Sequence, residues 1–119
     1  MKKVMLVAPR DQREGLQCIL GDRCTLLPCQ APGAAVELLA QRPDALILSL
    51  PLSGMDGLGF LEQNAPDLPR QILVLTTFLN EEMLAAFSRL NVDTVIRLPV
   101  SPDSLRKKLN DFCIKKRPS

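Results

Sequence analysis

The chain has 119 residues, 46% of them hydrophobic, and a formal net charge of +2 at pH 7. This length and composition suit one compact domain that buries a core, rather than two domains. The longest apolar runs extend for only about five residues, which excludes a membrane span and a secretory signal. We therefore expect a cytoplasmic protein without membrane contacts.

The cysteine and histidine content excludes the commonest metal and catalytic chemistry. The four cysteines form no C-x-x-C pair and the chain has no histidine, so a zinc site is not expected. Free cysteines usually behave as small buried hydrophobic residues, and we expect that behaviour here. The absence of histidine also removes the commonest general base.

The positive charge is concentrated at the C-terminal end of the chain. Residues 101–119 hold six basic and two acidic side chains. Without aromatic interleaving or a recognition motif, this pattern favours the solvated face of a last helix. We expect no nucleic-acid binding through this domain, and we interpret residues 115–119 as a basic tail or the start of a linker.

Apolar periodicity predicts five strands that alternate with five helices. The elements expected in the first half are strand 4–7, helix 11–20, strand 24–27, helix 34–41 and strand 45–50. Pro43 ends the second helix. Strand 45–50 is apolar at successive positions, as in central parallel strands that are covered on both faces.

The second half of the chain continues the alternation. The expected elements are helix 58–63, strand 71–76, helix 81–90, strand 94–98 and a last helix that begins at Pro102. Asn80 and Ser101 are the predicted N-caps of the last two helices. The inward stripe of the last helix is predicted to consist of Leu105, Leu109, Phe112 and Cys113.

This strict alternation predicts a doubly wound α/β domain with a five-stranded parallel sheet. In such sheets the functional site lies beyond the carboxyl ends of the strands, at the topological switch point. The residues that the prediction places there are Ala8, Pro9, Ser49, Thr76 and Leu98.

Several segments of the chain resemble the receiver domains of response regulators. The most specific is Arg42–Ser49 followed by Gly54–Gly57, and Leu73–Thr76 and Leu98–Pro102 agree with it in order and spacing. The resemblance extends from Lys3 to about Phe112. It implies a flavodoxin-like fold with strand order 2-1-3-4-5, formed by residues 1–114, and a role in two-component signalling, also called phosphorelay signal transduction.

The resemblance also shows what the chain lacks. At the positions where the family has its acidic, metal-binding pair, this sequence has Ala8 and Pro9. Ser49 stands at the position of the phosphoacceptor aspartate, and Leu98 at the position of a lysine that contacts the phosphoryl group. The sequence is therefore similar to a receiver that has lost its phosphorylation chemistry.

At other receiver positions the chain keeps some of the family's residues and replaces others. Thr76 matches the hydroxyl residue that follows phosphorylation in the family, whereas Val95 replaces the aromatic switch residue. Pro99 matches a proline whose preceding peptide bond is usually cis in the family. Asp56 and Gly57 match structural residues of the turn after the third strand.

The chemistry of the substituted residues excludes metal-assisted phosphoryl transfer. Mg²⁺ requires hard oxygen ligands, usually including carboxylates, and Ala8, Pro9 and Ser49 supply none. A serine hydroxyl without a general base is also a poor nucleophile at neutral pH. We therefore expect no enzymatic activity, no bound metal and no cofactor.

The hydroxyl of Ser49 has three possible roles in the sequence. We expect it to end a buried strand and to form a hydrogen bond with a neighbouring backbone group or with Thr76. The alternatives are phosphorylation of Ser49 and the binding of a small ligand in the vacated pocket.

Our interpretation is an atypical receiver, or pseudo-receiver, that works as a phosphorylation-independent interaction or dimerisation module. Its partner is expected to be another protein or a second copy of the chain. A DNA-binding output domain for transcription regulation is expected to follow it, and nucleic-acid contacts would then belong to that domain. By resemblance, the interaction face consists of Glu81, Glu82, Arg89, Arg97, Arg106 and Lys107.

Overall fold

Five parallel strands form one sheet in the order β2-β1-β3-β4-β5. The structure is a computed structural model that describes residues 3–21, 24–29, 32–50 and 57–114. The elements in chain order are β1 (Lys3–Val7), α1 (Arg10–Leu20), β2 (Thr25–Cys29), α2 (Pro32–Leu39), β3 (Ala45–Leu50), α3 (Gly57–Gln63), the 3-10 helix η1 (Ala65–Asp67), β4 (Gln71–Thr76), α4 (Glu81–Arg89), β5 (Thr94–Arg97) and α5 (Pro102–Ile114).

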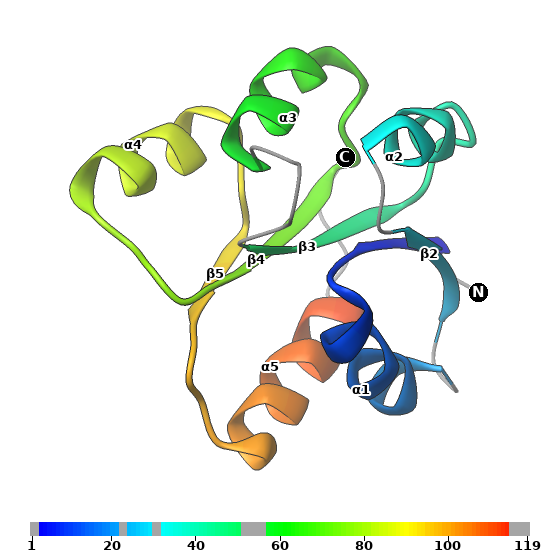
Figure 1. Cartoon of the computed structure of the whole chain (residues 1–119), viewed down its shortest axis with the longest axis vertical. Helices are drawn as coiled ribbons and strands as arrows, with labels where there is room; N and C mark the ends of the chain where they lie inside the picture. The colour runs from blue at the N-terminus through cyan, green and yellow to red at the C-terminus, as the bar shows by residue number, and fades with distance from the viewer. Residues whose placement is uncertain (1–2, 22–23, 30–31, 51–56, 115–119) are drawn as a thin grey trace.

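The helices cover both faces of the sheet, as Figure 1 shows. Helices α1 and α5 lie on one face, and α2, α3 and α4 lie on the other. This arrangement confirms the predicted doubly wound α/β class and the flavodoxin-like strand order.

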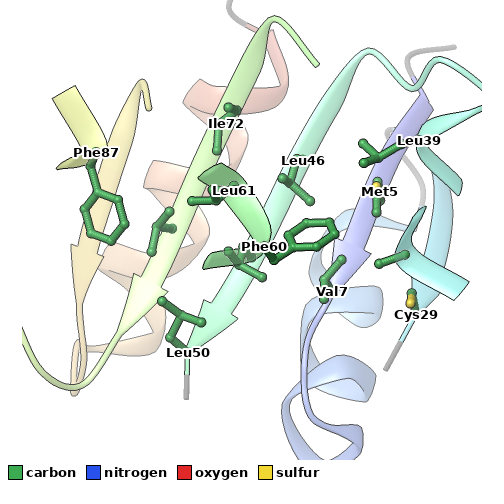
Figure 2. Close-up of a cluster of buried hydrophobic side chains, with 13 residues drawn as sticks. Met5, Val7, Cys29, Leu39, Leu46, Leu50, Phe60, Leu61, Ile72 and Phe87 are labelled. Atoms are coloured by element: carbon green, nitrogen blue, oxygen red, sulfur yellow. The ribbon is translucent and has the colours of Figure 1, made fainter. Parts of the chain in front are cut away.

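Each face of the sheet has its own apolar core because side chains alternate along a strand. Val4 and Leu6 of β1 pack in the core under α1 and α5, whereas Met5 and Val7 pack in the core under α2, α3 and α4. Figure 2 shows the second of these cores, with Phe87 over β4 and β5. Every residue of β3 and β4 is buried, as expected for central strands covered on both faces.

The element boundaries differ from the predictions by a few residues. The second strand was predicted at 24–27, but β2 is Thr25–Cys29 and includes Pro28. An edge strand tolerates proline because one of its sides forms no ladder hydrogen bonds. Helix α2 begins at Pro32 and ends at Leu39, earlier at both ends than predicted. The earlier start is possible because proline is compatible with a first helical turn.

The predicted N-caps are confirmed. The Asn80 side-chain oxygen Oδ1 accepts a hydrogen bond from the backbone N–H of Met83 at 2.8 Å. The Ser101 hydroxyl accepts one from the backbone N–H of Ser104 at 3.2 Å. Each cap satisfies an N–H group that has no partner within its own helix.

Not all of the cysteine side chains that the structure describes are buried. Cys24 and Cys29 are buried as expected, whereas the expectation is wrong for Cys18, which is exposed on α1. The side chain of Cys113, the residues 54–56 of the predicted turn and the predicted tail 115–119 lie outside the described part. No helix in that described part is both long and apolar enough to span a bilayer.

The cap of α4 gives a direct test of this local structure. Asn80→Ala is expected to lower the free energy of unfolding by about 1 kcal/mol, because the Met83 N–H loses its side-chain acceptor. Urea denaturation would measure the change. Ser88→Ala, on the exposed part of the same helix, is the matched control and is expected to stay within about 0.5 kcal/mol of the wild type. Equal effects of the two substitutions would contradict the assigned cap.

Candidate functional site

The candidate site lies at the carboxyl ends of β1 and β3, where the strand order reverses direction. Val7 pairs with Leu48 across these neighbouring strands, so the next residues, Ala8 and Ser49, follow at the same edge of the sheet. Ala8 is fully buried, and its N–H donates to the carbonyl of Cys29 at 3.3 Å. The edge is thus tied to β2 as well.

Helix α1 begins directly beside this edge. Pro9 is its N-cap residue, and the Pro9 carbonyl accepts hydrogen bonds from the N–H groups of Gln12 at 3.1 Å and Arg13 at 2.9 Å. This first turn brings the half-buried side chain of Gln12 to the end of β3. There the fully buried Ser49 hydroxyl donates a hydrogen bond to the amide oxygen Oε1 of Gln12.

The expected partner of Ser49, a backbone group or Thr76, is therefore wrong. Ser49 pairs with Leu75 in the sheet, and Thr76 pairs with Leu50. Because side chains alternate, Ser49 belongs to the face of α1 and α5, whereas Thr76 belongs to the face of α2, α3 and α4. The sheet separates the two hydroxyls.

Gln12 is the functional residue that the sequence reasoning missed. It lies four and eight residues before the buried Leu16 and Leu20 on α1, and therefore on the same helical stripe. A polar residue at the start of an apolar stripe was a usable signal. It indicates a side chain that turns inward at the carboxyl edge of the sheet.

Thr76 forms its hydrogen bonds within its own loop. Its hydroxyl donates to the carbonyl of Phe78 at 2.8 Å and accepts from the N–H of Phe78 at 3.3 Å. The buried hydroxyl is thus satisfied by the backbone that follows β4.

The remaining receiver positions lie along β5 and just after it. Val95 is half-buried and packs against the core under α4, and Leu98 is half-buried and packs against the core under α5. The N–H of Leu98 donates to the carbonyl of Thr76 at 2.7 Å. The peptide bond between Leu98 and Pro99 is cis, as the resemblance implies.

The donor set of this edge does not fit Mg²⁺. Ala8 and Pro9 offer no side-chain ligand, and the single hydroxyl, Ser49, is already bonded to a neutral amide. Mg²⁺ prefers several hard oxygen ligands in octahedral geometry, usually with carboxylates among them. Among the described residues, no three histidine, cysteine, aspartate or glutamate side chains gather in a way that could hold a metal ion.

A cavity of about 770 Å³ lies at the opposite edge of the sheet, before β3 and β4. Its walls come from α2, from the segment between α2 and β3, and from the segment between α3 and β4, and include Leu39, Pro43 and Leu68. Ala8, Pro9, Ser49 and Thr76 do not line it. This cavity is therefore distinct from the vacated receiver pocket that was considered as a ligand site.

The six residues of the predicted interaction face lie on three neighbouring elements. Glu81, Glu82 and Arg89 are on α4, Arg97 ends the edge strand β5, and the two others, Arg106 and Lys107, are on α5. Figure 1 shows α4 and α5 on the two sides of β5. All six residues are exposed, and none forms an ion pair within the described part of the chain.

The strand order and the position of the candidate site define a flavodoxin-like α/β domain. No protein-family model and no curated protein matches the sequence. Solved structures do match it, and those described below are receiver domains or response regulators.

The non-phosphorylated receiver domain of HemR from Leptospira biflexa has a TM-score of 0.84 and 20% identity, over 100% of this chain and 99% of that chain. The chemotaxis protein CheY4 of Vibrio cholerae has a TM-score of 0.79 and 21% identity, over 94% and 98%. The Mn²⁺-bound response regulator Rcp1 has a TM-score of 0.75 and 27% identity, over 92% and 89%. The protein therefore has the receiver fold, and the resemblance seen in its sequence is confirmed.

A double-mutant cycle would test the hydrogen bond between β3 and α1. Ser49→Ala is expected to cost about 1 to 3 kcal/mol of unfolding free energy, because it leaves the Gln12 amide oxygen without its donor. Gln12→Ala is expected to cost a similar amount. The double variant should lose less than the sum of the single losses, by about 0.5 kcal/mol or more.

Chemical denaturation of the four proteins would give the coupling energy. Glu14→Ala, an exposed substitution on α1, is the control and should be close to neutral. Strictly additive losses for Ser49 and Gln12 would contradict a direct interaction between the two side chains.

Proposed function

We propose that the protein is an atypical response-regulator receiver domain that takes part in two-component signalling without accepting a phosphoryl group. It acts as a protein interaction and dimerisation module. The observation that carries the proposal is the neutral Ser49–Gln12 hydrogen bond at the position where receivers have their phosphoacceptor.

The chemistry at Ser49 supports this function. Phosphoryl transfer needs a nucleophile, an in-line approach and positive charge on the transferred group. The Ser49 hydroxyl is fully buried, and its proton is directed at an amide oxygen, which is not a general base. Leu98 carries no charge that could stabilise a phosphoryl group. Each requirement is therefore unmet by these residues.

The charges of the face formed by α4, β5 and α5 support an interaction role. Glu81 and Glu82 are acidic at the start of α4, whereas Arg97, Arg106 and Lys107 are basic on β5 and α5. A two-fold symmetric contact requires a surface that is complementary to itself, which means that it must present both signs of charge. We therefore favour a second copy of the chain as the partner.

In this proposal residues 1–114 form the receiver domain, and residues 115–119 are a basic tail or the start of a linker. A DNA-binding output domain after this linker would make the protein a transcription regulator. Contacts with nucleic acid would then belong to the output domain. The exposed basic residues of α5 are not interleaved with exposed aromatic residues. This supports a solvated helix face on α5 rather than a nucleic-acid-binding surface.

Treatment with a small-molecule phosphodonor in the presence of Mg²⁺ tests the proposal directly. We expect the intact mass of the protein to stay unchanged, because neither Ser49 nor its surroundings supports transfer. A receiver domain with the usual aspartate serves as the positive control for the reagent. The thermal unfolding midpoint is likewise expected to be unaffected by Mg²⁺.

A mass increase of one phosphoryl group would overturn the proposal if it disappears in Ser49→Ala. The variant that combines Ala8→Asp, Pro9→Asp and Ser49→Asp provides the matched comparison. If the missing carboxylates are the cause of inactivity, this variant is expected to gain a thermal shift with Mg²⁺.

A further inference from the structure

Phe78 is the most exposed large hydrophobic side chain in the described part of the chain. It is 64% exposed, compared with 50% for Val36 and 47% for Leu84. The three other phenylalanines, Phe60, Phe87 and Phe112, are all buried. Burying a large apolar side chain stabilises a fold, so leaving Phe78 in water forgoes a stabilisation that the other three provide.

The backbone of Phe78 is fixed although its side chain is exposed. The Thr76 hydroxyl binds both the N–H and the carbonyl of Phe78. On the other side, Leu79 packs against the core under α4, and Asn80 caps that helix. The loop is thus anchored on both sides of Phe78. Because the backbone of Phe78 is already fixed, binding has to order only its side-chain torsions, which lowers the entropic cost of binding.

Charged side chains of both signs lie near Phe78. Thr76 pairs with Arg97 across β4 and β5, so the loop with Phe78 begins beside this exposed arginine. Glu81 and Glu82 follow within the first turn of α4. Leu84, in the same part of the helix, adds a second exposed apolar side chain.

We propose that Phe78 is the apolar anchor of the contact between two copies of this chain and that Thr76 is its positioning residue. The inference rests on the proposed dimerisation function. The acidic residues at the start of α4, beside Phe78, are complementary in charge to the basic residues of β5 and α5 on a second copy. A two-fold symmetric contact would pair the acidic residues of each copy with the basic residues of the other. Interfaces of this kind have a buried aromatic anchor surrounded by a charged rim.

The inference gives Thr76 a role that differs from a switch. In the receiver fold a hydroxyl at this position is available to respond to a phosphoryl group. In this chain it is bonded to the backbone of Phe78, on the opposite face of the sheet from Ser49. Thr76 then keeps the anchor in one place permanently, and dimerisation needs no signal from the site at Ser49.

Sedimentation equilibrium of the full chain tests the anchor. The wild type is expected to dimerise reversibly, and Phe78→Ala is expected to weaken the dimer about tenfold or more. Val36→Ala removes another exposed apolar side chain, on α2, and is the matched control that should leave the dimer unchanged. Thermal unfolding should be similar for both variants, since neither side chain is buried.

The role of Thr76 is tested in the same experiment. Thr76→Val removes both hydrogen bonds to Phe78 with little change in shape, and it should weaken the dimer several-fold. Thr76→Ser keeps a hydroxyl and should restore dimerisation. A purely structural role would lower the stability of Thr76→Val while leaving the dissociation constant of the dimer unchanged, and this result would overturn the positioning role.

The outcomes separate the inference from the function on which it rests. A wild type that stays monomeric at every concentration would overturn both the dimerisation proposal and the anchor. A dimer with the same dissociation constant in wild type and Phe78→Ala would overturn the anchor alone. Equal weakening by Phe78→Ala and Val36→Ala would also overturn it, because the effect would then not be specific to this loop.

Discussion

A single neutral hydrogen bond, from Ser49 to Gln12, determines what the switch-point edge of this domain can do. It connects the end of β3 to the first turn of α1 without any ion. Its net contribution is about 1 kcal/mol, but leaving either buried group without a partner would cost more. Both groups are therefore held together, and neither of them carries a charge.

The hydroxyls at the ends of β3 and β4 belong to opposite faces of the sheet. Ser49 lies on the face of α1, and Thr76 lies on the face of α4, each with its own hydrogen-bond partner. A ligand shifts a conformational equilibrium only by interacting differently with two states of a shared element. Among the described contacts of these two side chains there is no shared element.

The sequence was sufficient to predict the fold, because the alternation of apolar strands and amphipathic helices is a local pattern repeated along the whole chain. It failed where a long-range contact decides the outcome. The second strand was predicted at 24–27, but β2 continues through Pro28 to Cys29, because an edge strand tolerates proline. Ser49 was correctly predicted to be a buried hydroxyl at a strand end, but its hydrogen-bond partner was predicted wrongly. The partner depends on which face of the sheet Ser49 lies on, and strand pairing sets that face. Gln12 was missed because it lies in the first turn of α1, 37 residues from Ser49, and the contact depends on how that helix packs beside β3.

The fixed loop after β4 explains why a threonine is useful in a chain that lacks the rest of the receiver chemistry. The hydroxyl of Thr76 satisfies both backbone groups of Phe78, which would otherwise depend on water at an exposed loop. A serine or threonine at this position is therefore justified by local hydrogen bonding alone, without reference to phosphorylation. The phenyl ring of Phe78, by contrast, contributes little to the packing of the domain, because it is 64% exposed. The stabilisation that Phe78 forgoes in the monomer is recovered only when another surface covers the ring, and the self-complementary charges around it favour a second copy of the chain as that surface.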